Sequence, residues 1–487
     1  MKKKRNDEIV ISCLGLSQDN VTGSCWSVSY LKDNGERGLV VLECGLSQKE
    51  QDVLKAYNEN KRMLENIGLD IVQNCEYVLL SHPHVDHIGN LSFFNDDNGF
   101  QGKILASHKT IEFGKELIKD SVYISNKNVE YLHSKGKKVK PLYTEPQMYQ
   151  MFDHMESVEV GEKIKLNDNL TVQFHNNSHS CGSTSISLYI RKPNNTVRHI
   201  LYSGDNGCKV TRELTPYLED EQLPRKCDLF ISEFTYCDKN KKITKKQAID
   251  ERKELLNKTK SALLQGKRVL IATFSYNRTQ VLLDLFYEEF HDEDWFEFPV
   301  VCDGVLSNKI NDKYLSNLEG EDLERFRQVM SWNRLKLNRD YKSTIATLSK
   351  PTAGIFMASS GFCCAGRIVT YLKEFLNDSN ALVILSGYCG TKDSIGGQIV
   401  NPDVKKVTLD GDVILKRAEV MHLKTFSSHI QYDENIQLFS EMKTRKIIIH
   451  HSEITDEQLK EVKEQLMDKG VTTPIIRTSK CCNQFVL

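Results

Sequence analysis

The stretch Ser81-His82-Pro83-His84-Val85-Asp86-His87-Ile88-Gly89 holds three histidines and one aspartate within six residues. It follows an apolar run, Tyr77-Val78-Leu79-Leu80, that is typical of a buried strand. A loop that leaves the end of a strand can aim its side chains rigidly. Imidazole and carboxylate groups are the usual non-thiol ligands of zinc and similar divalent ions. Four such donors crowd one tetrahedral ion, so the loop predicts two ions: the first two histidines bind one, and the aspartate and third histidine bind the other.

The composition limits the class of protein. The chain has 487 residues, more than one ordinary domain, and its 39% hydrophobic and 27% charged residues are typical of a soluble globular protein. A net charge of −1 creates no overall field that attracts nucleic acid, so a polyanion would need a local patch. No apolar run approaches the ~18 residues of a membrane span, so we expect no membrane partner.

The 14 cysteines raise the question of disulfides. The N-terminus runs from Met1 into a strand-like Ile9–Ser12 without an apolar signal core. We therefore expect reduced thiols that pack as small hydrophobes, and a protein of the cytoplasm, or of the nucleus in a eukaryote. No Cys-x-x-Cys pair occurs, and the pairs Cys363-Cys364 and Cys481-Cys482 are expected in strands or turns.

The order of elements predicts an α/β chain with an insertion. Short strands bounded by turn residues dominate up to Tyr236, with helices expected over 47–66 and 110–124 and a polar, Lys-rich stretch over 125–150. The basic segment 239–246 then opens a helical pattern, and strands alternate with helices, including one over 307–332. That alternation predicts a parallel sheet with crossover helices. Near Val413 the chain returns to strands, and a helix is expected over 455–468.

Further acid and imidazole groups follow other predicted strands. Asp205 comes after Leu201-Tyr202-Ser203-Gly204, Glu233 ends the run 228–233, and His450-His451 end the run 446–451. A carboxylate that bridges two ions would hold them ~3.5–4 Å apart, although an aspartate after glycine is also common in ordinary turns. With the histidine loop, four predicted strand ends carry acid or imidazole groups. Together they indicate one site along one rim of a sheet.

A third ligand for the first ion has two candidates. His179 lies in a loop after a strand, and His175 lies closer to the interior of that strand. The loop position favours His179 over His175. A lone histidine is otherwise most often an ordinary surface or core residue.

These segments together resemble the metallo-β-lactamase superfamily, and within it the β-CASP branch of nucleic-acid-processing metallonucleases that includes the polyadenylation endonuclease subunit and RNase J. The histidine loop is similar to the superfamily signature. The other matching segments are Val21-Thr22-Gly23-Ser24-Cys25, Ser203-Gly204-Asp205, Glu233-Phe234-Thr235-Tyr236, Phe274-Ser275-Tyr276-Asn277-Arg278-Thr279-Gln280, the run 358–367, the run 387–391, Phe426-Ser427-Ser428-His429 and His451-Ser452-Glu453.

The resemblance implies an αββα sandwich with an inserted β-CASP cap. The sandwich would comprise residues 1–238 and 425–487, and the cap residues 239–424. It also implies two Zn²⁺ ions, with Mn²⁺ or another divalent ion as the alternative. The implied metal ligands are His82, His84 and His179 on one ion, Asp86, His87 and His451 on the other, and Asp205 as the bridge. The implied catalytic residues are Asp86, Glu233 and His429.

In this scheme His429 protonates the leaving oxygen and Glu233 orients it, while the ions lower the pKa of a water towards ~7. The chain departs from the family pattern at three places. Glu43 stands where the first motif usually has Asp, Gln431 stands where Asp usually follows two residues after the histidine of motif B, and Phe234 replaces Ser. Groups that orient ligands tune a metal site, so these changes would affect rate or substrate, while every implied metal ligand is present.

The predicted function is hydrolysis of phosphodiester bonds in RNA, single-stranded and internal to the strand. A DNA nuclease or a 5′-exonuclease of the same branch is the alternative, because discrimination by the 2′-OH depends on groove geometry. A non-catalytic subunit of a processing complex is the third hypothesis. A cap suits a threaded strand whose backbone follows a basic groove, and the lysines of 239–246 would line its edge or merely start a solvated helix. A homodimer or a protein complex is the expected assembly.

Overall fold

The computed structural model describes residues 8–16, 20–479 and 483–487, so Cys481 and Cys482 lie outside the described residues. The chain forms two compact units. Unit 1 comprises the chain up to Lys209, with Leu218–Lys242 and Ser428–Leu487, and unit 2 comprises Val210–Tyr217 and Ile243–Ser427. The domain bounds expected from the family pattern remain a prediction. No helix in the described part of the chain is long and apolar enough to cross a membrane.

Unit 1 contains two seven-stranded sheets. The first has the order β22 (Gln484–Val486), β1 (Val10–Cys13), β2 (Trp26–Leu31), β3 (Arg37–Leu42), β4 (Tyr77–Leu79), β5 (Lys103–Ser107) and β6 (Met155–Val158). The second has the order β21 (Ile475–Arg477), β20 (Ile447–His450), β11 (Leu229–Glu233), β10 (Val197–Tyr202), β9 (Thr184–Arg191), β8 (Leu170–Asn176) and β7 (Lys163–Lys165).

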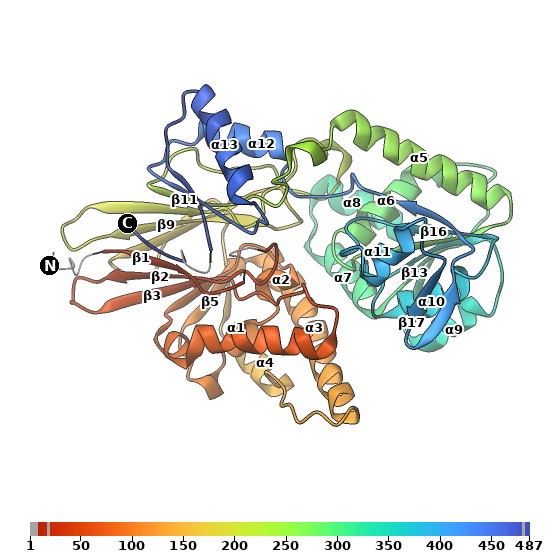
Figure 1. The fold of residues 1–487 in the computed structure, drawn as a ribbon, viewed down its shortest axis with the longest axis horizontal. Coiled ribbons are helices and arrows are strands. Elements are labelled where there is room, and N and C mark those ends of the chain that lie inside the picture. The colour runs from red at the N-terminus through yellow and green to blue at the C-terminus, as the bar shows by residue number, and fades with distance from the viewer. Residues whose placement is uncertain (1–7, 17–19, 480–482) are drawn as a thin grey trace. The chain divides into compact units, whose positions relative to one another are not determined.

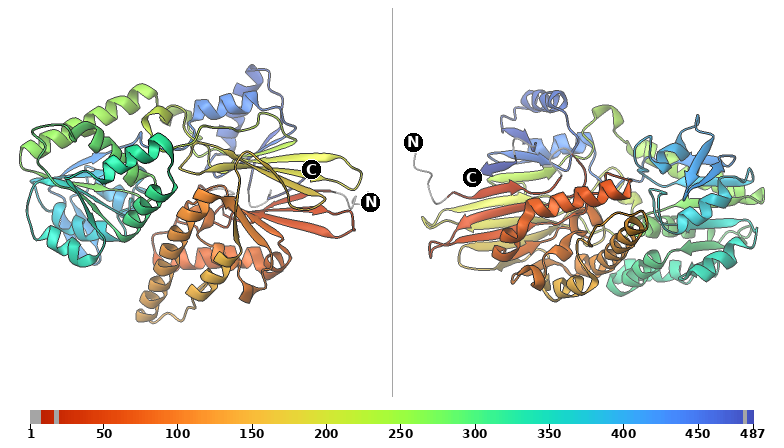
Figure 2. Two further views of the ribbon diagram at one scale, coloured as in Figure 1. Left: turned by 180° about the vertical axis from the view of Figure 1, so that it is seen from behind. Right: turned by 60° about the horizontal axis from the view of Figure 1, so that its bottom comes forward.

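The two sheets pack face to face because alternate residues of their strands are apolar. In β9, Ile186, Leu188 and Ile190 point into a core shared with Val28 and Val40 of the first sheet. Helices cover both outer faces (Figures 1 and 2). The first sheet is covered by α1 (Val53–Asn74), α3 (His108–Ser134) and α4 (Glu145–Asp153), and the second by α12 (Tyr432–Glu441) and α13 (Asp456–Asp468). The prediction of an αββα sandwich is confirmed.

Unit 2 is built on a six-stranded, wholly parallel sheet, as the alternation of strands and helices predicts. The strand order is β14 (Leu335–Asn338), β13 (Val300–Asp303), β15 (Gly354–Ala358), β12 (Arg268–Ala272), β16 (Ala381–Leu385) and β19 (Glu419–His422). A separate two-stranded sheet pairs β17 (Lys406–Leu409) with β18 (Asp412–Leu415). The helices are α5 (Lys245–Leu264), α6 (Arg278–Phe290), α7 (Val305–Asn317), α8 (Gly320–Met330), α9 (Tyr341–Leu348), α10 (Arg367–Phe375) and α11 (Ile395–Val400).

Several local expectations were wrong. The helix expected over 307–332 is two helices, because Gly320 has a φ of 56° and Leu318 is extended and buried. Of the lysines of 239–246, three precede α5 (Lys239, Lys241 and Lys242), and only Lys245 and Lys246 lie in its first turn. That helix begins at Lys245, where the Thr244 side chain accepts the Gln247 N–H in a capping box. The first helix starts at Val53, six residues later than expected, behind an Asp52 cap.

Candidate metal centre

The predicted site residues gather at one edge of the second sheet of unit 1. Strands β10, β11 and β20 are parallel neighbours, and β8 runs in the same direction because it is antiparallel to β9, as β10 is. Their carboxyl ends therefore meet at one edge, where they deliver His179, Asp205, Glu233 and His451. The histidine loop reaches this edge from β4 of the facing sheet, and it includes the short helix α2 (Val85–Ile88).

The first donor group consists of His82, His84, His179 and Asp205, whose ligand atoms all lie within 4.8 Å of one another. The Nε2 atom of His179 is 3.1 Å from Nδ1 of His84 and 3.6 Å from Oδ2 of Asp205. The Nε2 atom of His82 is 3.5 Å from the same carboxylate oxygen. The loop histidines and His179, 95 residues apart in sequence, thus form one set.

The second donor group consists of Asp86, His87 and His451. Oδ2 of Asp86 is 3.3 Å from Nε2 of His451 and 3.8 Å from Nε2 of His87. Asp205 reaches this group too, because its Oδ2 is 3.3 Å from Nε2 of His87 and its Oδ1 is 3.6 Å from Nδ1 of His451. Its carboxylate therefore touches both groups, as a bridging ligand must.

The donor set fits divalent ions. The fully buried atoms Nε2 of His82, Nε2 of His87 and Oδ1 of Asp205 have no hydrogen-bond partner in the described structure. Leaving such atoms unpaired in a protein interior is costly. Ligand atoms ~2.1 Å from a tetrahedral ion stand about 3.4 Å apart, close to the 3.1–3.8 Å spacings observed here. A cation is the group that satisfies all of them at once.

The protonation states of His82, His84 and Asp86 agree with this, whereas the buried carboxylates around His87 raise the pKa of that ring although burial opposes it. Burial lowers the pKa of His82 to about 3 and that of His84 to about 4, so both imidazoles are neutral lone-pair donors at neutral pH. Burial works against ionisation of Asp86, but the neighbouring His87 and His451 hold the pKa of this carboxyl below its ordinary value. Metal ligation needs these forms of both groups.

Buried partners orient the imidazoles. Glu43, which is fully buried, accepts the Ser81 N–H at 2.7 Å through Oε1 and lies 2.7 Å from Nδ1 of His87 through Oε2. The Ser81 hydroxyl lies 2.8 Å from Nδ1 of His82. A partner at Nδ1 leaves Nε2 of each ring for a metal ion. Ser81 has no predicted role in the sequence, although its place directly before His82 is a signal for one.

His429 forms a further possible donor group with Asp205 and His451, and it is held by an acid. Its Nδ1 is 3.2 Å from Oε1 of Glu233 and 3.9 Å from Oδ2 of Asp205. Burial opposes protonation, but Glu233 and Asp205 raise the pKa of His429 to about 9. The side chains of His429 and Asp86 are 23% and 19% exposed, whereas those of His82, His87, Asp205 and Glu233 are at most 2% exposed. His429 and Asp86 therefore mark the open side of the site.

A threonine joins the two halves of the site. The Thr235 hydroxyl is 3.0 Å from Nδ1 of His451 and 3.3 Å from Nδ1 of His429. Its backbone N–H donates to Oε2 of Glu233 at 2.8 Å. Thr235 lies within the segment Glu233-Phe234-Thr235-Tyr236 but has no predicted role there, because a hydroxyl between two imidazoles is visible only in three dimensions.

Comparisons with known proteins identify the family. Residues 23–218 match the model of the metallo-beta-lactamase superfamily, and residues 279–399 match that of the Beta-Casp domain. The chain belongs to the β-CASP branch of the metallo-β-lactamase superfamily. The predicted family is thus confirmed.

Relatives of this β-CASP protein include ribonucleases. It is 26% identical to Ribonuclease TTHA0252 of Thermus thermophilus, over 89% of this chain and 91% of that protein. It is 24% identical to Integrator complex subunit 11 of Gallus gallus, over 92% and 69%, and 25% identical to Endoribonuclease ysh1 of Schizosaccharomyces pombe, over 79% and 48%. A crystal structure of a protein of unknown function from Enterococcus faecalis V583 matches 99% of this chain and 100% of that chain, with a TM-score of 0.52 and 13% identity, which shows likeness of fold.

The departures from the β-CASP pattern have local structural roles. Gln431 caps α12, where its side chain and Glu434 form a capping box, and its Nε2 donates to the His429 backbone carbonyl at 2.9 Å. Phe234 is fully buried and stacks on Tyr432 with ring centroids 5.6 Å apart. Neither residue contributes an atom to the two donor groups.

The two rival histidines lie outside the donor groups. His175 Nε2 is 2.9 Å from the Ser187 hydroxyl, and burial lowers the pKa of this histidine to about 4. His450 is fully buried and packs edge-on against Trp26 with ring centroids 5.7 Å apart. In this β-CASP protein the structure therefore brings His179 and His451, not their neighbours, to the centre.

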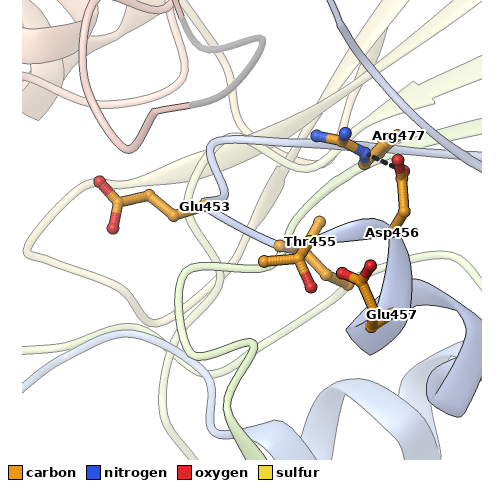
Figure 3. Close-up of a pocket in the computed structure, with 6 residues that line it drawn as sticks. Glu453, Thr455, Asp456, Glu457 and Arg477 are labelled. Carbon is orange, nitrogen blue, oxygen red and sulfur yellow. Dashed lines mark hydrogen bonds and ion pairs between the residues drawn. The ribbon is translucent and has the colours of Figure 1, made fainter.

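A surface pocket next to His451-Ser452 is a different feature. It lies at the start of α13 and is lined by Glu453, Ile454, Thr455, Asp456, Glu457 and Arg477 (Figure 3). The single cation, Arg477, is paired with Asp456 at 2.7 Å, and Glu453 points away from that pair. Its acidic lining disfavours a phosphate, so this pocket does not compete with the metal centre as a site for nucleic-acid chemistry.

Proposed function

We propose that this protein is a two-zinc ribonuclease that cleaves single-stranded RNA internally. The observation that carries the proposal is an imidazole, His429, held by Glu233 at the open side of two donor groups that share Asp205. The names of the relatives, ribonuclease and endoribonuclease, support RNA as the polymer and internal cleavage as the mode. Zinc is proposed because histidine-rich, four-donor sets suit it.

His82, His84 and His179 would hold one ion, Asp86, His87 and His451 the other, and Asp205 both. When bound, the ions would lower the pKa of a coordinated water and offset negative charge on the scissile phosphate. Asp86, at the open side, would also orient that water.

The chain itself would supply the proton for the leaving oxygen. His429 would donate Nδ1–H to Oε1 of Glu233 and present Nε2–H to the leaving alkoxide. Glu233 is suited to orienting this ring because it is fully buried and its other oxygen already accepts the Thr235 N–H. If the leaving oxygen departed without a proton, it would be a strongly basic alkoxide. Protonation by the His429 imidazole would prevent this.

The test is an incubation of the purified protein with labelled single-stranded RNA, single-stranded DNA and a generic β-lactam, with and without a chelator. We expect chelator-sensitive cleavage of RNA, and equal rates for substrates with free and blocked 5′ ends. Cleavage of DNA alone, a requirement for a free 5′ end, or hydrolysis of the β-lactam alone would each contradict the proposal. Sedimentation of the same preparation would distinguish a homodimer from a chain that needs other subunits.

His429→Ala tests the proton donor. We expect both ions to be retained, because His429 belongs to neither triplet of ligands, and turnover to fall by roughly 10²–10⁴. His291→Ala is the matched control, since this histidine is on unit 2 at the end of α6. Unchanged turnover of His429→Ala would remove this residue as the acid.

A further inference from the structure

The exposed side of α3 carries lysine and tyrosine in alternation at every fourth residue. The series is Lys119, Tyr123, Lys127, Tyr131 and Lys135, the last directly after the helix. Residues four apart are neighbours on a helix surface, and each step of four turns by about 40°, so the five residues form a row that winds around the exposed side. Tyr123 is 62% exposed and Tyr131 is 50% exposed, and the lysine that follows each ring lies over it, with Nζ 5.9 Å and 5.5 Å from the ring centroid. We call these five residues the α3 ridge.

The ridge is not explained by the packing of the helix. The opposite face of α3 already buries Ile118, Val122, Val129 and Leu132, so the tyrosines contribute nothing to the core. Large aromatic side chains that gather on an exposed helix face indicate a surface that another molecule covers. In each pair the lysine Nζ lies over one face of the tyrosine ring, so the cation–π contact occupies one face only.

The charge of this region is opposite in sign to that of the chain. From Lys119 to Lys140 there are six lysines and two acidic residues, a net charge of +4 in a chain of net charge −1. Lys119 pairs with the buried Glu116, whereas Lys127 pairs with Glu130 in an exposed pair of the kind that exchanges readily. Among the described residues, the lysines that follow the helix form no ion pair; they are Lys135, Lys137, Lys138 and Lys140. This is the local patch that a polyanion requires.

The same helix is anchored at the metal centre, within unit 1. The Ser107 and Thr110 hydroxyls both donate to the Gly182 carbonyl, at 2.7 Å and 3.0 Å, three residues after His179. A Cβ on Gly114 would lie 3.1 Å from Ile88 of the histidine loop. At 1.5 Å per residue, the ridge therefore begins about 8 Å beyond Gly114 and ends about 32 Å beyond it. Figure 1 shows α3 leading from beside α2 to a projecting turn before α4.

We propose that the α3 ridge and the lysines after it bind the part of a single-stranded RNA that flanks the cleavage point, with nucleobases stacked on Tyr123 and Tyr131 and phosphates paired with the lysines. This rests on the proposed function, whose substrate it positions. Alternating aromatic and basic groups are how proteins bind a single strand without reading its sequence. An acidic protein segment would use the lysines but would have no need of two exposed rings at this spacing.

The experiment compares two sets of substitutions on full-length protein. The first is Tyr123→Ala with Tyr131→Ala, and the second is Lys137→Gln, Lys138→Gln and Lys140→Gln. Controls are Tyr341→Ala, similarly exposed on unit 2, and Lys460→Gln and Lys463→Gln on the surface of α13 with Lys469→Gln directly after it. Each protein is assayed on an RNA of about 20 nucleotides and on a small aryl phosphodiester, and its binding to the same RNA is measured after chelation, at several salt concentrations.

We expect the tyrosine pair to raise KM for the long RNA about 10–100-fold with kcat unchanged, and to leave the small substrate unaffected. We expect the lysine set to weaken binding and to reduce the slope of log K against log salt by about 2. An unchanged KM, an equal loss on the small substrate, or loss through the lysines but not the tyrosines would overturn the proposal; the last pattern would instead indicate an acidic partner. Because RNA binding is measured without metal, the binding result tests the α3 ridge even if the protein cleaves no RNA.

Discussion

The substitution Glu43→Gln tests whether the Glu43 carboxylate orients the His87 ring, because it keeps the size of the side chain and changes its hydrogen bonding. The wild-type carboxylate accepts at both oxygens, from the Ser81 N–H and at Nδ1 of His87, each at 2.7 Å. The amide of glutamine has the same shape but only one acceptor. If its oxygen keeps the Ser81 N–H, its NH₂ group faces Nδ1 of His87. That nitrogen must then accept, which moves the ring proton to Nε2, the atom 3.3 Å from Asp205 Oδ2.

The magnitude follows from this tautomer change. A protonated Nε2 cannot bind metal. The ring must therefore change to the less favourable tautomer before the ion binds, and the free energy of that change weakens binding. Removing an orienting partner of a ligand typically weakens metal binding 10–100-fold, which is about 1.4–2.7 kcal/mol. If the amide turns the other way, the buried Ser81 N–H faces a donor, and the free energy of unfolding falls by about 1–3 kcal/mol instead.

The assay is dialysis against a competing chelator with metal counted per chain, together with urea unfolding of the metal-free protein. We expect one of the two ions to be held 10–100-fold more weakly. Glu76→Gln is the control, because Glu76 lies just before β4, at the end opposite the histidine loop, and bonds Lys32 and Tyr30. Wild-type affinity for both ions together with unchanged unfolding would refute the reasoning.

Three further predictions concern single residues. Asp205→Ala should lose metal and activity together, since its carboxylate touches both donor groups, and near-normal metal content would count against a bridge. Thr235→Val should lower kcat about 10–100-fold and Thr235→Ser should restore it, measured on RNA; equal activity of all three forms would contradict a role in orienting His429. In the folded protein, burial lowers the pKa of His175 to about 4, below the ordinary 6.5. The neutral ring is therefore compatible with the fold above pH 6.5, and the free energy of unfolding decreases as pH falls from 6.5 towards 4. Between pH 7.5 and pH 5, the free energy of unfolding of the metal-free wild-type protein should fall by about 2 kcal/mol more than that of metal-free His175→Gln, as measured by urea titration. Equal decreases in the two proteins would show that His175 titrates normally.

Local sequence patterns predicted the elements that have a strong pattern of their own. The histidine loop, the strand before it and four parallel strands of unit 2 (β12, β13, β15 and β16) follow from apolar runs bounded by turn residues. Elements that depend on distant packing were missed. Helix α12 buries Ile436 and Phe439 against the second sheet, and β14 pairs only with β13, so neither has a strong pattern of its own. The break between α7 and α8 depends on a buried Leu318 rather than on proline or a charge run.

The sequence by itself determined the chemistry of this protein: which side chains are donors, that they follow strands, and that four of them share one loop. Only the tertiary structure decided which donors meet. His179 rather than His175 faces the loop because β8 ends between them, and His451 rather than His450 does so because β20 ends at the buried His450 and the chain turns at His451, which has a φ of 48°. The same applies to Glu43, whose longer side chain reaches His87 only because the backbone places it there, with a φ of 66°. Donor identity is a property of each residue, whereas a coordination shell requires atoms up to 365 residues apart to be held within a few ångströms, which only the packed sheets provide.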